Sequence, residues 1–170
     1  MKARDKIRTA DELVGVCLAA RERHSRVVFT NGCFDVLHVG HVRYLEAARS
    51  LGDLLIVAVN SDISVRQIKG PLRPIFPEAE RCELVAALSC VDFVCLFDTP
   101  DPLPLITLLQ PEILVKGADW PLDKTVGAEE VMKAGGKVVH VQLVSGVSTT
   151  KIIERILDRF QEKDETTIRD

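Results

Sequence analysis

Two histidines, His38 and His41, stand shortly after an apolar run and are separated by three positions. The run 27–29 predicts a short buried strand, and residues 39–50 predict the helix that follows it. Side chains three positions apart share a helix face, and the N–H groups and dipole of a helix N-terminus favour an anion. Gly40 leaves room for a ligand to approach the backbone. A single histidine is most often a surface or core residue, whereas this matched pair predicts a phosphate site whose imidazoles supply protons or positive charge.

Positive side chains recur in the stretch 66–73, which holds Arg66, Lys69 and Arg73 and no acid. Such a stretch is often only a solvated loop. Beside a triphosphate site, however, Lys69 becomes a candidate phosphate ligand, and the following Gly-Pro pair indicates a loop able to close over substrate. Lys116 ends a predicted buried strand, where a charge needs an anionic partner.

The chain contains five cysteines, an odd number, and most of them lie in apolar segments typical of reduced, buried thiols. There is no CxxC pair and no histidine at zinc-ligand spacing, so the sequence predicts no structural metal. Cys33 lies in the turn before the histidines. It is either a nucleophile or a small turn residue, and the second interpretation is favoured because no carboxylate–histidine relay is evident.

Segments with helical and strand-like patterns alternate along the chain, which predicts an α/β fold. Strands are expected at 27–30, 54–59, 91–97, 113–115 and 137–143, and helices at 9–23, 39–50, 77–88, 103–109, 126–133 and from 148. We therefore expect one domain, 1–161, with a Rossmann-like doubly wound parallel five-stranded sheet, helices on both of its faces and a loose tail at 162–170.

Polar residues gather where these predicted strands end, and in such sheets ligands bind beyond the carboxyl ends of the strands. They are Asn31, Gly32, Cys33, Phe34 and Asp35 after the first strand, Asn60 and Asp62 after the second, Lys116, Gly117, Asp119 and Trp120 after the fourth, and Ser148 and Thr149 after the fifth. Neither GxGxxG nor GxxxxGK occurs, so no dinucleotide fingerprint or Walker loop is present.

The amino-acid composition is typical of a compact domain and argues against some classes of binding partner. The chain has 170 residues, of which 28% are charged and 46% hydrophobic, and its net charge is −3. A negative balance argues against a surface that coats nucleic acid. No apolar run approaches about 18 residues, and the charged start lacks an apolar signal region. We expect a cytoplasmic protein with no nucleic-acid or membrane partner.

The stretches Gly32-Cys33-Phe34-Asp35, His38-Val39-Gly40-His41 and Ser148-Thr149-Thr150 together resemble the HxGH nucleotidyltransferase superfamily. Within it, residues 30–44, 60–75, 116–120, 126–127 and 146–150 are similar to the bacterial adenylyltransferases of ADP-heptose synthesis, and the similarity covers nearly all of 7–160. Those enzymes occur as a separate chain or as the second half of a bifunctional kinase–transferase. The resemblance therefore implies a separate sugar kinase in the same pathway.

The resemblance implies a reaction and a role for each site residue. AMP would pass from ATP to D-glycero-β-D-manno-heptose 1-phosphate, giving ADP-heptose and pyrophosphate for lipopolysaccharide core synthesis. Mg²⁺ would be bound mainly through the triphosphate. Catalysis falls to His38, His41 and Lys69; nucleotide binding to Asn31, Gly32, Cys33, Phe34, Asp35, Gly40, Lys116, Gly117, Ser148 and Thr149; and acceptor binding to Asn60, Asp62, Arg73, Asp119 and Trp120.

One departure bears on the subfamily. Related cytidylyltransferases carry an arginine just before the Ser-Thr-Thr stretch, where this chain has Leu143-Val144-Ser145-Gly146. The missing guanidinium favours the heptose branch over a cytidylyltransferase for glycerol, ethanolamine or another polyol phosphate, which is the alternative. A non-catalytic nucleotide-binding module is the alternative of another class. Asp35 is either a turn residue or an orienter of the site, and the resemblance favours the orienter. Whether Asp119 and Trp120 are ligands or packing residues, and whether the chain self-associates, stays open.

Overall fold

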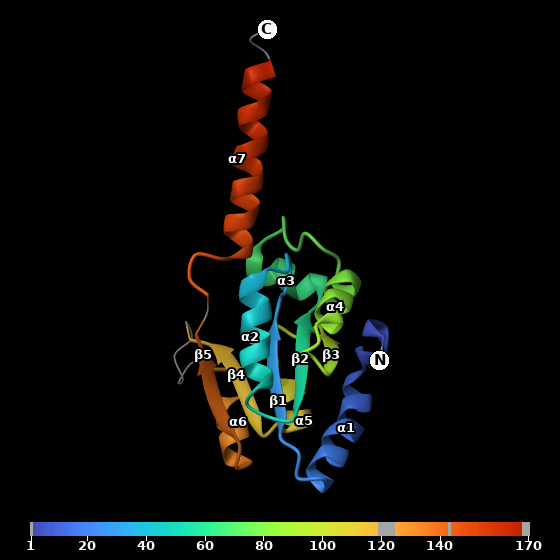
Figure 1. Cartoon of the computed structure of the whole chain (residues 1–170). Helices are drawn as coiled ribbons and strands as arrows, with labels where there is room; N and C mark the ends of the chain where they lie inside the picture. Colours follow the sequence, from blue (N-terminus) through green and yellow to red (C-terminus); the bar gives the residue numbers. More distant parts are fainter. Residues whose placement is uncertain (1, 119–124, 143, 168–170) are drawn as a thin grey trace.

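A five-stranded parallel sheet forms the centre of the computed structural model, which describes residues 2–118, 125–142 and 144–167. The strand order is β3-β2-β1-β4-β5 (Figure 1), so the chain crosses from one side of the sheet to the other between β3 and β4. The strands are β1 (Val27–Gly32), β2 (Leu54–Asn60), β3 (Phe93–Phe97), β4 (Ile113–Gly117) and β5 (Lys137–Val141). The expected doubly wound sheet is confirmed.

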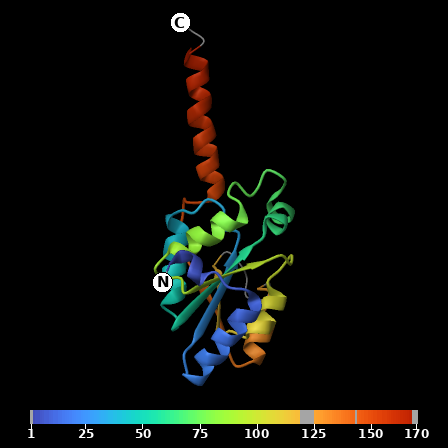
Figure 2. The ribbon, with the colours of Figure 1, turned by 90° about the vertical axis from the view of Figure 1, so that its right-hand side faces the viewer.

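Helices cover both faces of this sheet, as the two views show (Figures 1 and 2). On one face α2 (Val39–Arg49) and α4 (Glu78–Ala87) bury residues such as Leu45 and Val85 against the strands. On the other face α1 (Ala10–Glu22), α5 (Leu103–Leu109) and α6 (Ala128–Lys133) bury residues such as Leu13, Ile106 and Val131. The remaining helices are the short η1 (Ala3–Lys6), α3 (Asp62–Lys69) and α7 (Thr149–Thr167).

Local sequence explains where the helices begin. Thr9 and Glu12 form the expected capping box of α1, in which Glu12 N donates to Thr9 Oγ1 at 3.3 Å and Thr9 N donates to Glu12 Oε2 at 2.8 Å. The N-terminus of α7 is held by Ser148, whose Oγ accepts from Lys151 N at 3.2 Å. Each cap defines the residue at which its helix begins, whereas the apolar pattern alone would define that start only to within one helical turn.

Several element ends shift by one or two residues, as in β5, which ends at Val141 rather than at residue 143, and three differences have an evident local cause. The stretch around Lys69 is not a loop but the end of α3, a helix capped by Ser61, whose hydroxyl accepts from Ser64 N at 3.2 Å. The third strand begins at Phe93 rather than at residue 91, because the backbone N–H of Val91 closes a turn onto Leu88 O at 3.2 Å.

The third difference is α7, which is helical through Thr167 although a loose segment was expected from residue 162. The stretch 149–167 contains neither glycine nor proline and is rich in good helix formers. In Figure 1 the helix extends away from the sheet beyond the carboxyl ends of the strands, and Ile156, Leu157 and Phe160 on it are exposed. No helix in the described part of the chain is long and apolar enough to cross a membrane.

Candidate active site

A cavity of about 650 Å³ lies at the carboxyl ends of the strands, where the sequence places the site. It is bounded by the ends of β1, β2 and β4, the first turn of α2 and the first turn of α7. Its lining comprises Asn31, Gly32, Cys33, Phe34, Asp35, His38, Gly40, His41, Tyr44, Asn60, Ile68, Lys69, Arg73, Pro100, Asp101, Pro102, Lys116, Gly117, Thr125, Val126, Val144, Val147, Ser148, Thr149 and Thr150.

The two histidines stack on each other at the start of α2. Their ring centroids are 3.8 Å apart with an interplanar angle of 17°, and Phe34 meets His41 edge-on at 5.3 Å. Nδ1 of His38 accepts from Gly40 N at 3.1 Å, and Nδ1 of His41 accepts from His38 N at 3.4 Å. Because each Nδ1 accepts a backbone N–H, the proton of each neutral ring lies on Nε2. The pair therefore offers two Nε2–H donors.

The surroundings also keep this pair neutral. Burial, and secondarily the neighbouring His38, lowers the pKa of His41 to about 4. Burial likewise lowers the pKa of His38. An anion bound against the rings would favour their charged forms. The rings are thus suited to donate hydrogen bonds to phosphate oxygens and to gain positive character as negative charge builds there.

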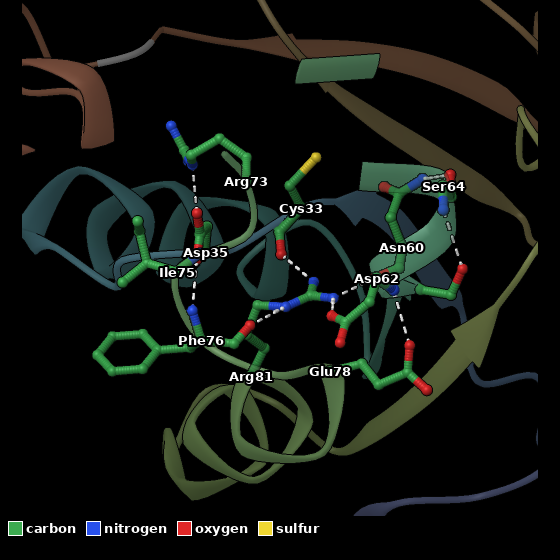
Figure 3. Close-up of polar contacts among 11 residues, drawn as sticks. Cys33, Asp35, Asn60, Asp62, Ser64, Arg73, Ile75, Phe76, Glu78 and Arg81 are labelled. Carbon is green, nitrogen blue, oxygen red and sulfur yellow. Dashed lines mark hydrogen bonds and ion pairs between the residues drawn. The ribbon is translucent and has the colours of Figure 1, made fainter. Parts of the chain in front are cut away.

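Asp35 is completely buried and fixes the loop that follows α3 (Figure 3). Its Oδ1 accepts from Ile75 N at 2.7 Å and from Phe76 N at 3.0 Å, and its Oδ2 accepts from Nε of Arg73. These bonds hold Arg73 at the cavity wall. These contacts agree with the interpretation of Asp35 as an orienter, which the resemblance favours and which stays a prediction.

Arg81 is the one buried guanidinium among the described residues, with 0% of its surface exposed, and the sequence analysis missed it. It donates to Cys33 O at 2.5 Å and Asn60 O at 2.7 Å, which join the ends of β1 and β2. It also donates to Phe76 O at 3.0 Å and to Oδ1 of Asp62 at 2.9 Å (Figure 3). The helical spacing could have predicted that Arg81 is buried, because Arg81 lies four positions before the buried Val85 and therefore on the same face of α4.

Two cationic side chains and a helix N-terminus also line the cavity. The exposed Lys69 and the half-buried Arg73 line it together with Ser148 and Thr149. Thr149 Oγ1 donates to Val36 O at 3.5 Å, which joins α7 to the loop before α2. Two helix N-termini thus open into one cavity, and their first N–H groups have no partner within the helix.

Cys33 lies at the same wall as a half-buried free thiol. Burial raises its pKa, and the nearby Lys69, Arg81 and Arg73 offset this only in part. A thiol held in its neutral form is a poor nucleophile. The structure therefore favours the small turn residue that the sequence analysis preferred.

Lys116 and Asn31 meet at the adjacent ends of β4 and β1, where Nζ of Lys116 donates to Oδ1 of Asn31. Burial lowers the pKa of Lys116 to about 8, although Asp101 acts in the opposite direction. On the same side Asn60 donates from Nδ2 to Ser64 Oγ at 2.9 Å. Asn31, Asn60 and Lys116 all line the cavity.

The structure brings together the predicted site residues that it describes, with the exception of Asp62. Asp62 is absent from the lining, because its carboxylate accepts from Arg81. Asp119 and Trp120 lie outside the described residues. Conversely, Tyr44, Asp101 and Thr125 line the cavity without having been predicted as ligands, since short polar side chains and a helix-borne tyrosine give no distinctive signal in sequence.

Within the described residues, no three His, Cys, Asp or Glu side chains are grouped so as to hold a metal ion. Both oxygens of Asp35 already accept hydrogen bonds from the loop that follows α3. The described residues alone therefore offer such an ion few oxygen ligands at this cavity.

Paired imidazoles at a helix N-terminus, in a parallel sheet of this topology, indicate the class of α/β nucleotidyltransferases. A sequence model of the cytidylyltransferase-like family matches residues 29–155, so the chain belongs to that family. The resemblance seen in the sequence is thereby confirmed.

Similar proteins agree with this family. "Bifunctional protein HldE" of Syntrophotalea carbinolica is 54% identical over 157 residues, 92% of this chain and 32% of that protein. Its namesake in Trichlorobacter lovleyi is 52% identical over 158 residues, 93% of this chain and 32% of that protein. The chain thus spans about a third of the length of these curated relatives. The crystal structure of the lipopolysaccharide core biosynthesis protein from Thermoplasma volcanium matches with a TM-score of 0.58 and 32% identity, covering 71% of this chain and 97% of that one.

Proposed function

We propose that this chain transfers AMP from ATP to D-glycero-β-D-manno-heptose 1-phosphate, giving ADP-heptose and pyrophosphate. The observation that carries the proposal is the pair of Nε2–H donors of His38 and His41, fixed by backbone bonds to their Nδ1 atoms. The relatives named as bifunctional HldE proteins and the lipopolysaccharide core biosynthesis protein support this pathway. A separate kinase would then supply the sugar 1-phosphate.

The chemistry is a direct displacement at phosphorus. An oxygen of the sugar 1-phosphate attacks the α-phosphorus of MgATP, a new P–O bond forms, and the bond to the β-phosphate breaks as pyrophosphate leaves with its electron pair. No enzyme nucleophile is needed, so catalysis rests on positioning and on neutralising charge. His38 and His41 donate to the α- and β-phosphate oxygens as charge develops.

The β- and γ-phosphates are met by the cations and the helix N-terminus on the same side. Backbone N–H groups at Ser148 and Thr149 bind phosphate oxygens. Lys69 and Arg73 add positive charge, and Asp35 keeps Arg73 in place. Mg²⁺ bound to the nucleotide would supply further positive charge to the triphosphate, in addition to that of Lys69 and Arg73.

A pyrophosphate-release panel tests this function. It crosses ATP, CTP, GTP and UTP with heptose 1-phosphate, glycerol phosphate and ethanolamine phosphate. We expect turnover with ATP and heptose 1-phosphate, at a kcat/KM at least about tenfold above that with CTP, equivalent to about 1.4 kcal/mol. Chelation of divalent ions should abolish it, and added Mg²⁺ should restore it.

Each other result of the panel overturns the proposal in a definite way. Comparable kcat/KM for ATP and CTP on the same acceptor would remove the argument from the missing arginine at residues 143–146. A preference for CTP with glycerol or ethanolamine phosphate would identify the cytidylyltransferase instead. Nucleotide binding without pyrophosphate release on any acceptor would identify a non-catalytic module.

A further inference from the structure

A row of polar side chains crosses four strands on the face of the sheet opposite α2. Along a strand, side chains alternate between the two faces. Phe29 and Leu114 belong to the core on the α1 and α5 side. Two positions further on, Asn31 and Lys116 therefore project from that same face, and the hydrogen bond between them agrees with this placement.

The row of polar side chains continues onto β2 on one side and onto β5 on the other. Ala58 is buried on the α1 and α5 side, so Asn60 at the end of β2 projects there as well. On β5, His140 is the register partner of Lys116, and its Nε2 lies 3.3 Å from Thr125 Oγ1. Asn60, Asn31, Lys116 and Thr125 all line the cavity.

This row lies across the sheet edge from the groups assigned to the triphosphate. Thr30 contacts Tyr44 of α2 at 2.7 Å, which shows that the α2 side is the other face of β1. His38 and His41 begin α2 and therefore lie on that other side. The cavity thus has the two histidines and the start of α7 on one side, and the ammonium of Lys116 on the other.

The geometry of the proposed reaction assigns an anion to each side. An in-line displacement at phosphorus requires the entering oxygen and the leaving group to lie on opposite sides of the α-phosphorus. If the leaving pyrophosphate lies against Lys69 and α7, the entering phosphate comes from the opposite side. Lys116 has a neutral amide as its hydrogen-bond partner, and the carboxylate of Asp101 acts on it only through space, so this half-buried ammonium is suited to receive that anion.

We propose that Lys116 binds the phosphate group of the sugar-phosphate acceptor, while Asn31 and Asn60 orient that acceptor. This inference rests on the proposed function and changes one expectation, since the resemblance implied that Lys116 and Asn31 bind the nucleotide. Lys116 holds two mutually repelling phosphates in reach of each other by neutralising the entering one. Asn31 fixes the direction of the ammonium, and Asn60 offers an amide to the sugar hydroxyls.

The test compares two lysines that line the cavity, Lys116 and Lys69, with a third lysine outside it. Lys116→Met removes the charge but keeps an apolar stem in the buried position, and Lys116→Gln is a second variant. Lys69→Met is the comparison variant, which is expected to affect ATP rather than the sugar phosphate. Lys137→Met is the matched control, because Lys137 is an exposed lysine at the start of β5. Steady-state kinetics gives KM for heptose 1-phosphate and for ATP, and calorimetry gives the dissociation constant of MgATP.

We expect Lys116→Met and Lys116→Gln to raise KM for the sugar phosphate about 10- to 100-fold, the range for losing one charge-assisted hydrogen bond. The dissociation constant of MgATP should change less than about threefold. Lys69→Met should show the reverse pattern, and Lys137→Met should match the wild type. A rise confined to the ATP parameters in the Lys116 variants, or no rise in either KM, overturns the inference.

A wild-type measurement covers the case in which both variants fail to fold. Acetic anhydride labels accessible amines, and mass spectrometry reports the extent at Lys116 and Lys69. Heptose 1-phosphate alone should protect Lys116 and leave Lys69 labelled; equal labelling of Lys116 with and without it overturns the inference. If the wild type releases no pyrophosphate from ATP with any sugar phosphate, the proposed function fails instead, which separates the two outcomes.

Discussion

The protonation of the paired histidines follows from backbone contacts that only a folded chain can make. Each Nδ1 is engaged by an N–H of the first turn of α2, so each ring presents Nε2–H to the cavity. Burial, with the nearby His38, lowers the pKa of His41 to about 4. Near neutral pH the free protein therefore presents donors without a fixed charge, which spares the site two mutually repelling cations.

The same pKa shift gives the unfolding free energy a pH dependence. The folded pKa of His41 lies below the usual histidine value of about 6.5, so the unfolded chain binds more protons between about pH 4 and 6.5. Stability from this group is full above about pH 6.5 and is lost as the pH falls, by at most about 1.4 kcal/mol per pH unit. Urea unfolding over this range should show a shallower pH dependence for His41→Gln than for the wild type.

The exposed His24, which has a positive φ of 55°, supplies the control for that measurement. His24→Asn suits this backbone and should leave the pH dependence of unfolding as in the wild type. Coincident curves for His41→Gln and the wild type would contradict the lowered pKa of His41.

Residue types near the site were predictable, but their partners were not. His38, His41 and Lys116 stand out because polar groups follow apolar strands there. That Asp62 pairs with Arg81 depends on the meeting of α3 and α4, which no local pattern encodes.

Among the elements, the ends of β1 and β2 depend on one helix for their mutual position. Arg81 of α4 donates to the carbonyl oxygens of Cys33 and Asn60. Lysine cannot reproduce this fork of donors. Arg81→Lys should lower the free energy of unfolding by about 3–5 kcal/mol, the range for breaking a buried charged network, as measured by urea denaturation.

An exposed pair on the same helix provides the comparison. Arg4 donates to Glu83 of α4 at 3.0 Å, and 80% of the Arg4 side chain is exposed. Arg4→Ala should therefore cost under about 1 kcal/mol. If the two substitutions cost the same, Arg81 does not hold the strand ends together.

The loop after α3 is a second element whose place depends on a single side chain. In Asp35→Asn one acceptor oxygen is replaced by an NH₂ group, so the bonds to Ile75 N, Phe76 N and Arg73 cannot all persist. Amide hydrogen exchange at Ile75 and Phe76 should become at least about tenfold faster. The sequence showed the positive charge of this loop, but it did not show that the carboxylate of Asp35 holds the loop in place.

Asp53→Asn is the control for this exchange experiment, because Asp53 accepts a backbone N–H too, from Arg26 at 2.7 Å, but is exposed and distant in sequence from the loop. It should leave exchange at Ile75 and Phe76 unchanged. Unaltered exchange in Asp35→Asn would show that the loop is held by other contacts.

At the scale of the whole molecule, the sheet was predictable because its strands are continuous apolar runs, as in 54–59, separated by helical patterns. The cavity's position followed from the topology of such a sheet. The short helix α3 was not predictable, because its eight residues carry few apolar side chains and its cap is a single serine. Nor was the extent of α7, whose exposed apolar side chains do not reveal from sequence where the helix ends.

The central claim is that this cavity transfers a nucleotidyl group through its two histidines, and single-turnover kinetics of His38→Ala and His41→Ala test it most directly. Each should lose roughly 10² to 10³ in the rate of chemistry, as when one transition-state donor is removed. Affinity for MgATP by calorimetry should change by less than about threefold, and the Tm by only a few degrees. Near-wild-type rates in both variants, with the fold intact, would contradict the account.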